Sequence, residues 1–284
     1  ESNNDWYEVG LMATGIVNPH SVAAAAGGAF NPETDITWHT LFWAEGTKYK
    51  ATNTVNAAPI VTVPDEYGAV ADYAVSSLAA GSPNFTHQTG TAGVLNGQPH
   101  WKTTSANHGT MSTGIWSKAF PSGPTTSLII ICEPDAVRVM GMLIDGPMNG
   151  GYGFVQDQVQ GSYGLRLYGP DATGLTNFYS GQQLAGGSVS AIRISKSTIA
   201  SAAYLHLNGL APILFGSATG GWSGYGYPTH QGVHLNSYSS GTPGSYPFNG
   251  AMPFVGIYDG QISSHAKWND LKAWALSHYG ATLT

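Results

Sequence analysis

The 284-residue sequence carries little charge: Asp, Glu, Lys and Arg make up 9% of it, whereas a typical soluble domain has about a quarter. Its net charge of -6 argues against nucleic acid and anionic membrane as the main partners. No apolar run approaches the roughly 18 residues of a membrane helix. The opening ESNNDWYEVG lacks the basic, apolar and small-residue succession of a signal peptide, so we expect none in this sequence.

Cysteine is almost absent. Cys132, the single cysteine, stands in the apolar run SLIIICEP, cannot form an internal disulfide, and is predicted to be a buried thiol. The chain is rich instead in Gly (38), Tyr (15) and Trp (8), and 42% of it is apolar, enough for a sizeable core. We therefore expect a single domain over residues 1–284.

Asn-Gly and Asp-Gly pairs punctuate the sequence and favour the turns that join antiparallel strands. Between them, polar and apolar residues alternate, as in YGLRLYG and SAIRIS, which is typical of strands with one buried face. Many short strands at such spacing predict two packed antiparallel sheets. The predicted strands are 127–132, 138–144, 163–168, 189–194, 202–207, 232–237 and 252–258.

The two ends of the chain differ from the rest. Residues 1–35 show no clear period and are predicted to be an N-terminal extension, for which a short helix, a linker and a packed coil all stay open. Near the other end a helix is predicted, capped by Ser263 or Ser264 and ended by Gly280. The residues at helical spacing, predicted to face the sandwich, are Trp268, Leu271, Trp274, Ala275 and His278.

The segment PFNGAMPFVGIYDGQISSHAKWNDLKAWALSHYG resembles the end of concanavalin A-like, or LamG-like, jelly-roll domains, especially those of phage and bacterial surface proteins. TLFWAEGTKY, VPDEYGAVADY and PNFTHQTGTAGVLNGQPHW are similar to earlier segments of that family, in the same order. The resemblance covers residues 36–284. The chain departs from the family pattern at two positions: Val63 stands where the family usually has Trp, and Gly260 stands where it commonly has a basic or polar residue. It implies an all-β fold, a two-sheet antiparallel jelly-roll sandwich with a short C-terminal helix.

Family members bind glycans, mediate adhesion, decorate virions or catalyse, so the resemblance alone names no function. Jelly-roll glucanases carry paired carboxylates on one strand, and Glu133 and Asp135 form an E-x-D in this chain. Pro134 lies between them, no third Glu follows, and we favour a solvated strand end.

A second enzymatic pattern is weaker still. QGVHLNSY, with His234 and Tyr238, is similar to a strand of jelly-roll alginate lyases, but three Arg are too few to clamp an acidic polysaccharide. His230 and His234 would share a strand face as zinc ligands do, but no third His or Cys stands near them.

A calcium site is predicted on IDGPMNGGYGFVQDQ. Asp145, Asn149 and Asp157 supply hard oxygen donors along a Gly-rich stretch, which suits Ca²⁺. The turn chemistry of Asp-Gly and Asn-Gly explains two of these residues equally well.

The segment TGGWSGYGYPTHQG, residues 219–232, carries the predicted glycan-binding residues Trp222, Tyr225, Tyr227 and His230. Aromatic rings stack on the C–H faces of sugars, while Ser, Asn and His bind hydroxyl groups, and neutral glycans need few charges. The alternative is that the three aromatic residues pack together as a small core of the loop.

The sequence thus predicts a non-enzymatic jelly-roll module, displayed on a virion or elsewhere in the extracellular space, for decoration, receptor binding or adhesion. Its expected partners are glycans or a host-surface receptor and other virion or surface proteins, with no nucleic acid and no membrane. A homo-oligomer stays open. The alternative function is that of a polysaccharide-degrading enzyme, a glycoside hydrolase or lyase, on the same fold.

Overall fold

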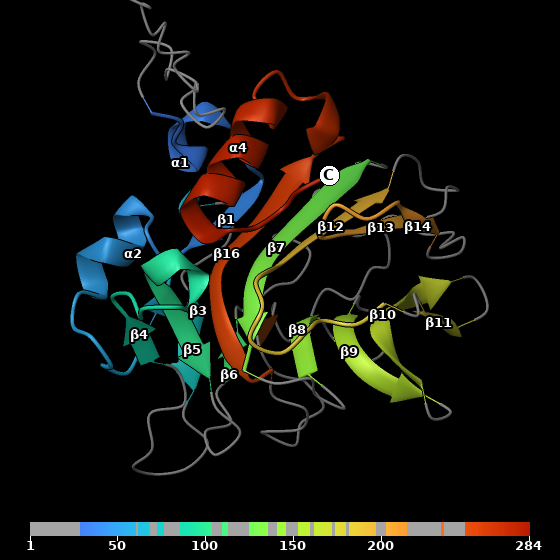
Figure 1. The fold of residues 1–284 in the computed structure, drawn as a ribbon, viewed down its shortest axis with the longest axis horizontal. Helices are drawn as coiled ribbons and strands as arrows, with labels where there is room; N and C mark the ends of the chain where they lie inside the picture. The colour runs from blue at the N-terminus through green and yellow to red at the C-terminus, as the bar shows by residue number, and fades with distance from the viewer. Residues whose placement is uncertain are drawn as a thin grey trace, which may run out of the picture. The chain divides into compact units, whose positions relative to one another are not determined.

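A computed structural model gives the structure of the protein (Figure 1). The chain divides into two compact units, Glu1–Phe30 and Asn31–Thr284, and the fold lies in the second. The structure describes residues 29–60, 62–68, 73–76, 86–103, 110–112, 125–135, 141–145, 153–159, 162–171, 174–179, 182–196, 203–214, 234–235 and 248–284.

Within the described residues, this unit contains two antiparallel sheets, each of eight strands. Sheet A contains β1 (Thr40–Trp43), β4 (Thr86–Gln88), β5 (His100–Thr103), β7 (Thr126–Pro134), β12 (Ser190–Lys196), β13 (Ala203–Leu207), β14 (Ile213–Leu214) and β16 (Gly250–Asp259). Sheet B contains β2 (Thr62–Val63), β3 (Tyr73–Ser76), β6 (Thr110–Ser112), β8 (Gly141–Asp145), β9 (Gly153–Val159), β10 (Ser162–Asp171), β11 (Gly174–Tyr179) and β15 (His234–Leu235).

The strand order shows how distant parts of the chain meet. Sheet A runs β14-β13-β12-β7-β16-β5-β4, and β1 also pairs with β16. Sheet B runs β11-β10-β9-β8-β15-β6-β3-β2. The predicted antiparallel β-sandwich is therefore confirmed, and each of the seven predicted strands overlaps a strand of the structure.

β7 explains why SLIIIC is apolar without a break. All nine of its residues are buried, because both faces of the strand are covered. Leu128, Ile130 and Cys132 belong to a core that also holds Val63 of β2 and Leu165 of β10, so this face looks toward sheet B. Cys132 is buried as predicted.

Helical segments are short: α1 (Pro32–Asp35), α2 (Thr47–Thr52), η1 (Leu95–Gly97), η2 (Ile262–Ser264) and α4 (Trp268–Tyr279). The predicted start of the last helix is wrong, because Ser263 and Ser264 form the separate turn η2 and Lys267 precedes α4 without a side-chain cap. Its end is confirmed, since Gly280 takes the left-handed conformation at φ 76°. In the described part of the chain no helix is long and apolar enough to cross a membrane.

Helix α4 packs on the outer face of sheet A, the face turned away from sheet B (Figure 1). Trp268, Leu271 and Ala275 are buried there, and Trp274 is half-buried against Phe254 of β16. The predicted role of the helix, covering the sandwich with its aromatic face, is confirmed.

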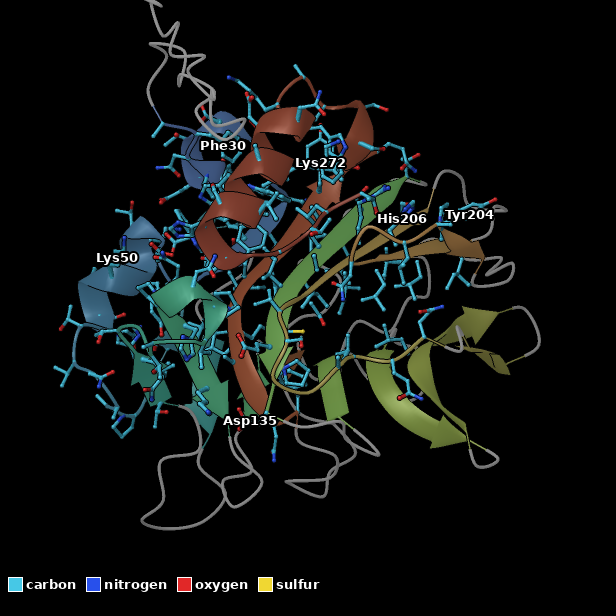
Figure 2. The ribbon with its side chains drawn as sticks, in the orientation of Figure 1. Phe30, Lys50, Asp135, Tyr204, His206 and Lys272 are labelled. Carbon is cyan, nitrogen blue, oxygen red and sulfur yellow. The ribbon has the colours of Figure 1, made fainter. Side chains whose placement is uncertain are left out.

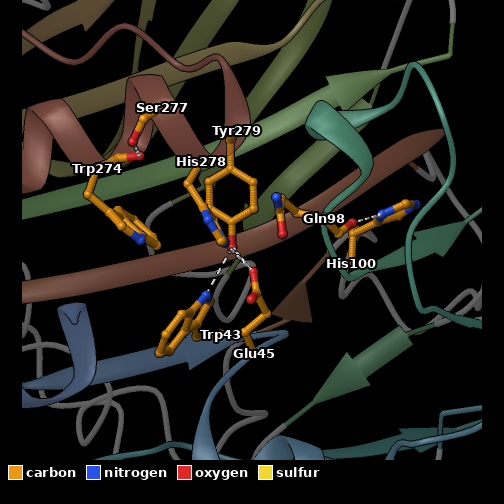
Figure 3. A network of polar contacts seen from close by, with 8 residues as sticks. All are labelled: Trp43, Glu45, Gln98, His100, Trp274, Ser277, His278 and Tyr279. Carbon is orange, nitrogen blue, oxygen red and sulfur yellow. Dashed lines mark hydrogen bonds and ion pairs between the residues drawn. The ribbon is translucent and has the colours of Figure 1, made fainter. Parts of the chain in front are cut away.

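A polar network ties the helix to β1 and the residues after it (Figure 3). The indole N–H of Trp43 donates to Tyr279 Oη at 2.9 Å, and Tyr279 Oη donates to Glu45 Oε1 at 3.1 Å. His278 Nε2 lies 2.6 Å from the same carboxylate oxygen. The ring of His278 also stacks on Trp274, at 5.3 Å between centroids. Burial, and secondarily Glu45, raise the pKa of the Tyr279 hydroxyl well above its usual value.

Candidate functional site

The aromatic segment predicted to bind glycans connects, along the sequence, a strand of sheet A to a strand of sheet B. It follows β14, which among the described strands pairs with β13 alone, at the edge of sheet A. It precedes β15, which lies between β6 and β8 inside sheet B. The predicted residues themselves lie outside the described residues, so their role stays a prediction: they are Trp222, Tyr225, Tyr227 and His230.

The register of β15 brings three chain segments to one end of sheet B. His234 pairs with Asp145, the last residue of β8, and with Ser112, the last residue of β6. Because these pairs are antiparallel, the first residue of β15 and the last residues of β6 and β8 lie at the same end of sheet B. Cα atoms paired in this way are about 4.5 to 5.5 Å apart. His234, two residues after the aromatic segment in the sequence, therefore lies beside Asp145 of the Gly-rich stretch.

The same register separates two members of the predicted calcium set. Ile144 pairs with Phe154 of β9, and Asp157 lies beyond Gln156, which pairs with Gly141 at the other end of β8. The backbone positions of Asp145 and Asp157 are thus about four residues, or about 13 Å, apart along the sheet. This separation favours Asp145 over Asp157 for any ion bound at the end near His234, and Asn149 lies outside the described residues.

Among the described residues no group of three or more His, Cys, Asp or Glu side chains is placed to hold a metal ion. A calcium ion would therefore rely on oxygen donors from the segments outside these residues, as the prediction on Asn149 already requires. The calcium site stays a prediction.

The carboxylates of the E-x-D pair both have partners within the sandwich. The predicted solvated strand end is wrong for Glu133, which is buried at the end of β7, where its Oε2 accepts a 2.8 Å hydrogen bond from the N–H of Leu95. Asp135 is exposed and forms an ion pair with Lys102 of β5 at 3.0 Å. Glu133 thus anchors the η1 turn on sheet A, and Asp135 lies just past the strand end.

A second group of polar side chains, on β12 and β13, was not predicted from the sequence. Arg193 pairs with His206 across the two strands, and Ser195 pairs with Tyr204. These four residues lie on the outer face of sheet A, because the guanidinium of Arg193 lies over the ring of Trp268 in α4, 5.4 Å from its centroid. The signal was the alternation in SAIRIS, which indicated a polar face without indicating which residues meet on it.

The hydrogen bonds of this group fix the protonation of His206. Arg193 Nη2 lies 3.0 Å from His206 Nδ1, and since a guanidinium can only donate, Nδ1 accepts and the ring proton is on Nε2. His206 Nε2 then points its proton at Ser195 Oγ over a long contact of 3.4 Å. Burial, and secondarily Arg193, lower the pKa of His206 to about 4, so the ring is neutral near pH 7.

The direction of the hydrogen bond between His206 and Ser195 is the reverse of that in a catalytic Ser-His pair. A general base must accept the proton of the serine hydroxyl, and in hydrolases a carboxylate orients the histidine for that task. Here an arginine takes the place of the carboxylate, and His206 donates to Ser195. The arrangement leaves the Ser195 hydroxyl with its own proton to donate, so it is suited to binding rather than to nucleophilic attack.

Comparison with known proteins shows likeness in fold alone. No family model and no curated protein sequence matches the chain. Domain 4 of AbnA, an extracellular GH43 arabinanase from Geobacillus stearothermophilus solved with arabinotriose, is similar at a TM-score of 0.52 and 10% identity. The match covers 79% of this chain and 93% of that domain. At this identity it shows a shared β-sandwich fold.

Two further solved structures are more distant. The binding domain of Paraclostridial Mosquitocidal Protein 1 matches at a TM-score of 0.47 and 8% identity, over 86% of this chain and 53% of that one. The CBM40 of the Ruminococcus gnavus IT-sialidase, bound to α2,3-sialyllactose, matches at a TM-score of 0.36 and 13% identity, over 49% of this chain and 78% of that one.

Proposed function

We infer that the protein is a non-enzymatic glycan-binding module that acts outside the cell or on a virion surface. Residues 219–232 are its main binding loop, with Trp222, Tyr225 and Tyr227 as stacking surfaces and His230 as a hydroxyl partner. The observation that supports this proposal is the register of β15, since His234, two residues after residues 219–232 in the sequence, pairs with the last residues of β6 and β8. Such loop clusters on a rigid sandwich are common places for binding sites.

The expected ligand is a neutral oligosaccharide. Three Arg and a net charge of -6 disfavour acidic polymers, whereas aromatic and hydroxyl side chains suit uncharged sugars. Arabinotriose, with which the structurally similar arabinanase domain was solved, is the first ligand to try. A calcium ion near Asp145 would order the neighbouring segments and so support the site indirectly.

Display on a surface fits a module of this kind. The protein would serve as a virion decoration, a receptor-binding unit or an adhesion unit, meeting host glycans or a surface receptor through the loop. Glu133 and Asp135, the residues that a hydrolase would need, have partners within the sandwich, and this favours binding over catalysis.

The test is an array of neutral and acidic oligosaccharides, followed by calorimetry with arabinotriose and with the strongest ligands of the array. The proposal expects binding to neutral members, weak or no binding to uronate- or sialate-containing ones, and no change in the ligand after long incubation. Absence of binding to every glycan and to whole host cells would overturn it. Release of reducing ends, or absorbance from unsaturated uronates, would support the enzymatic alternative.

A further inference from the structure

Tyr204 differs from the other residues of its strand. The neighbouring Leu205 and Leu207 point into the core and are buried, whereas Tyr204 lies on the outer face with 42% of its surface exposed. Figure 2 shows Tyr204 and His206 next to each other on β13, near the edge of sheet A, with Lys272 on the adjoining helix. An exposed aromatic ring among polar side chains offers a flat face on which a sugar can stack.

The groups beside Tyr204 are ordered by hydrogen bonds instead of being free side chains. Arg193 and Ser195 are 5% and 6% exposed, and Arg193 holds His206 in the tautomer that donates toward Ser195. Ser195 is the direct cross-strand partner of Tyr204, so the two side chains leave the same face of the sheet side by side. Side chains directly opposite each other have Cβ atoms about 4.5 to 5.5 Å apart. A ring and a directed hydroxyl donor therefore lie within the span of one sugar residue.

We propose that Tyr204, Ser195 and His206 form a sugar subsite on the outer face of sheet A, built from other residues than the 219–232 loop. Tyr204 stacks on the C–H face of one sugar ring, Ser195 donates its hydroxyl proton to a sugar oxygen, and His206 positions that hydroxyl. The proposal rests on the proposed function in that the ligand is a glycan.

The chemistry of the subsite selects an uncharged sugar. The guanidinium of Arg193 is already used, because its Nε donates to Thr284 O and its Nη2 to His206. Its face also lies over the ring of Trp268. Arg193 therefore has no free fork with which to clamp a carboxylate, and neutral His206 adds no charge.

The experiment is calorimetry with arabinotriose, xylohexaose and cellohexaose on the full chain. Tyr204→Ala should weaken the affinity for the preferred sugar about tenfold, as truncation of a central aromatic contact does. Tyr204→Phe should bind like the unmodified protein, and Ser195→Ala should weaken binding about threefold. Leu210→Ala, which removes an exposed apolar side chain just after β13, is the matched control and should change nothing.

A second measurement separates this proposal from the loop. Amide resonances of Ser195, Tyr204 and His206 should shift when the sugar is added to the Trp222→Ala protein, in which the loop is impaired. If the unmodified protein binds the sugar, Tyr204→Ala binds it equally well and these amides do not shift, the subsite is overturned and the proposed function stands. If Tyr204→Ala loses binding while Trp222→Ala retains it, the subsite stands and the proposed role of the 219–232 loop is overturned. Absence of any glycan binding by the unmodified protein would overturn both.

Discussion

Replacing Tyr279 by Phe removes one oxygen atom from the interior and tests how α4 is held on sheet A. The tyrosine ring is fully buried, so the substitution keeps the shape of the core and leaves no cavity of note. What it removes is the acceptor of the Trp43 indole N–H at 2.9 Å and a donor to Glu45 at 3.1 Å.

The expected cost follows from these two bonds. Trp43 is 7% exposed, so its N–H would be left without an acceptor and largely without water, at about 1–3 kcal/mol. The loss at Glu45 is smaller, because the carboxylate keeps His278 at 2.6 Å. We expect the free energy of unfolding to fall by about 2 kcal/mol, a large share of a typical total of about 5–15 kcal/mol.

Urea unfolding followed by tryptophan fluorescence measures this difference, with an unchanged slope against urea as the sign that only stability has moved. Tyr204→Phe is the control, since it removes a hydroxyl from an exposed ring and should cost almost nothing. In a double-mutant cycle, Tyr279→Phe should lower the free energy of unfolding much less in the Trp43→Phe protein than in the unmodified protein. A loss below about 0.5 kcal/mol for Tyr279→Phe, within the range of ordinary surface substitutions, would refute the reasoning.

Three further changes follow from the same structure. His206 has its pKa lowered to about 4 by burial, so it binds a proton in the unfolded chain near pH 6.5 but not in the folded one. The free energy of unfolding should therefore decrease as the pH falls from about 6.5 toward 4, and chemical denaturation across this range should show a weaker decrease for His206→Gln. Gly256→Ala would place a Cβ 2.6 Å from the Trp38 ring and should destabilise the fold by about 1–3 kcal/mol, seen as a lower melting temperature. Gly280→Ala, at φ 76°, should cost about 1 kcal/mol in urea unfolding, and an unchanged midpoint would contradict the role of Gly280 in ending α4.

The fold was predictable where its signals are local. Alternation in YGLRLYG and SAIRIS marked β10 and β12, and Asn208-Gly209 marked the turn after β13, where both residues have positive φ. The start of α4 was missed because the serines that could cap it form the turn η2 instead. Lys267, which precedes the helix, is not a residue type that favours a cap, so the local rule could not select it.

The candidate sites depend on contacts that no short pattern encodes. Arg193 meets His206 only because β12 and β13 pair in one register, and Trp43 meets Tyr279 across 236 residues of sequence. The proximity of His234 to Asp145 likewise follows from the order of strands in sheet B. The sequence therefore indicates residue types suited to a task, such as the aromatic residues of the 219–232 segment for stacking on sugars, but not their neighbours.

The central claim, that the 219–232 loop binds neutral glycans, is tested most directly by measuring affinity and melting temperature on one variant, Trp222→Ala. The control is Leu276→Ala, which removes an exposed apolar side chain from α4. If Trp222 is a stacking surface, its removal should weaken glycan affinity about tenfold or more and leave the melting temperature unchanged. A lower melting temperature with affinity retained would contradict the claim and show that the aromatic residues of the loop form a small core instead.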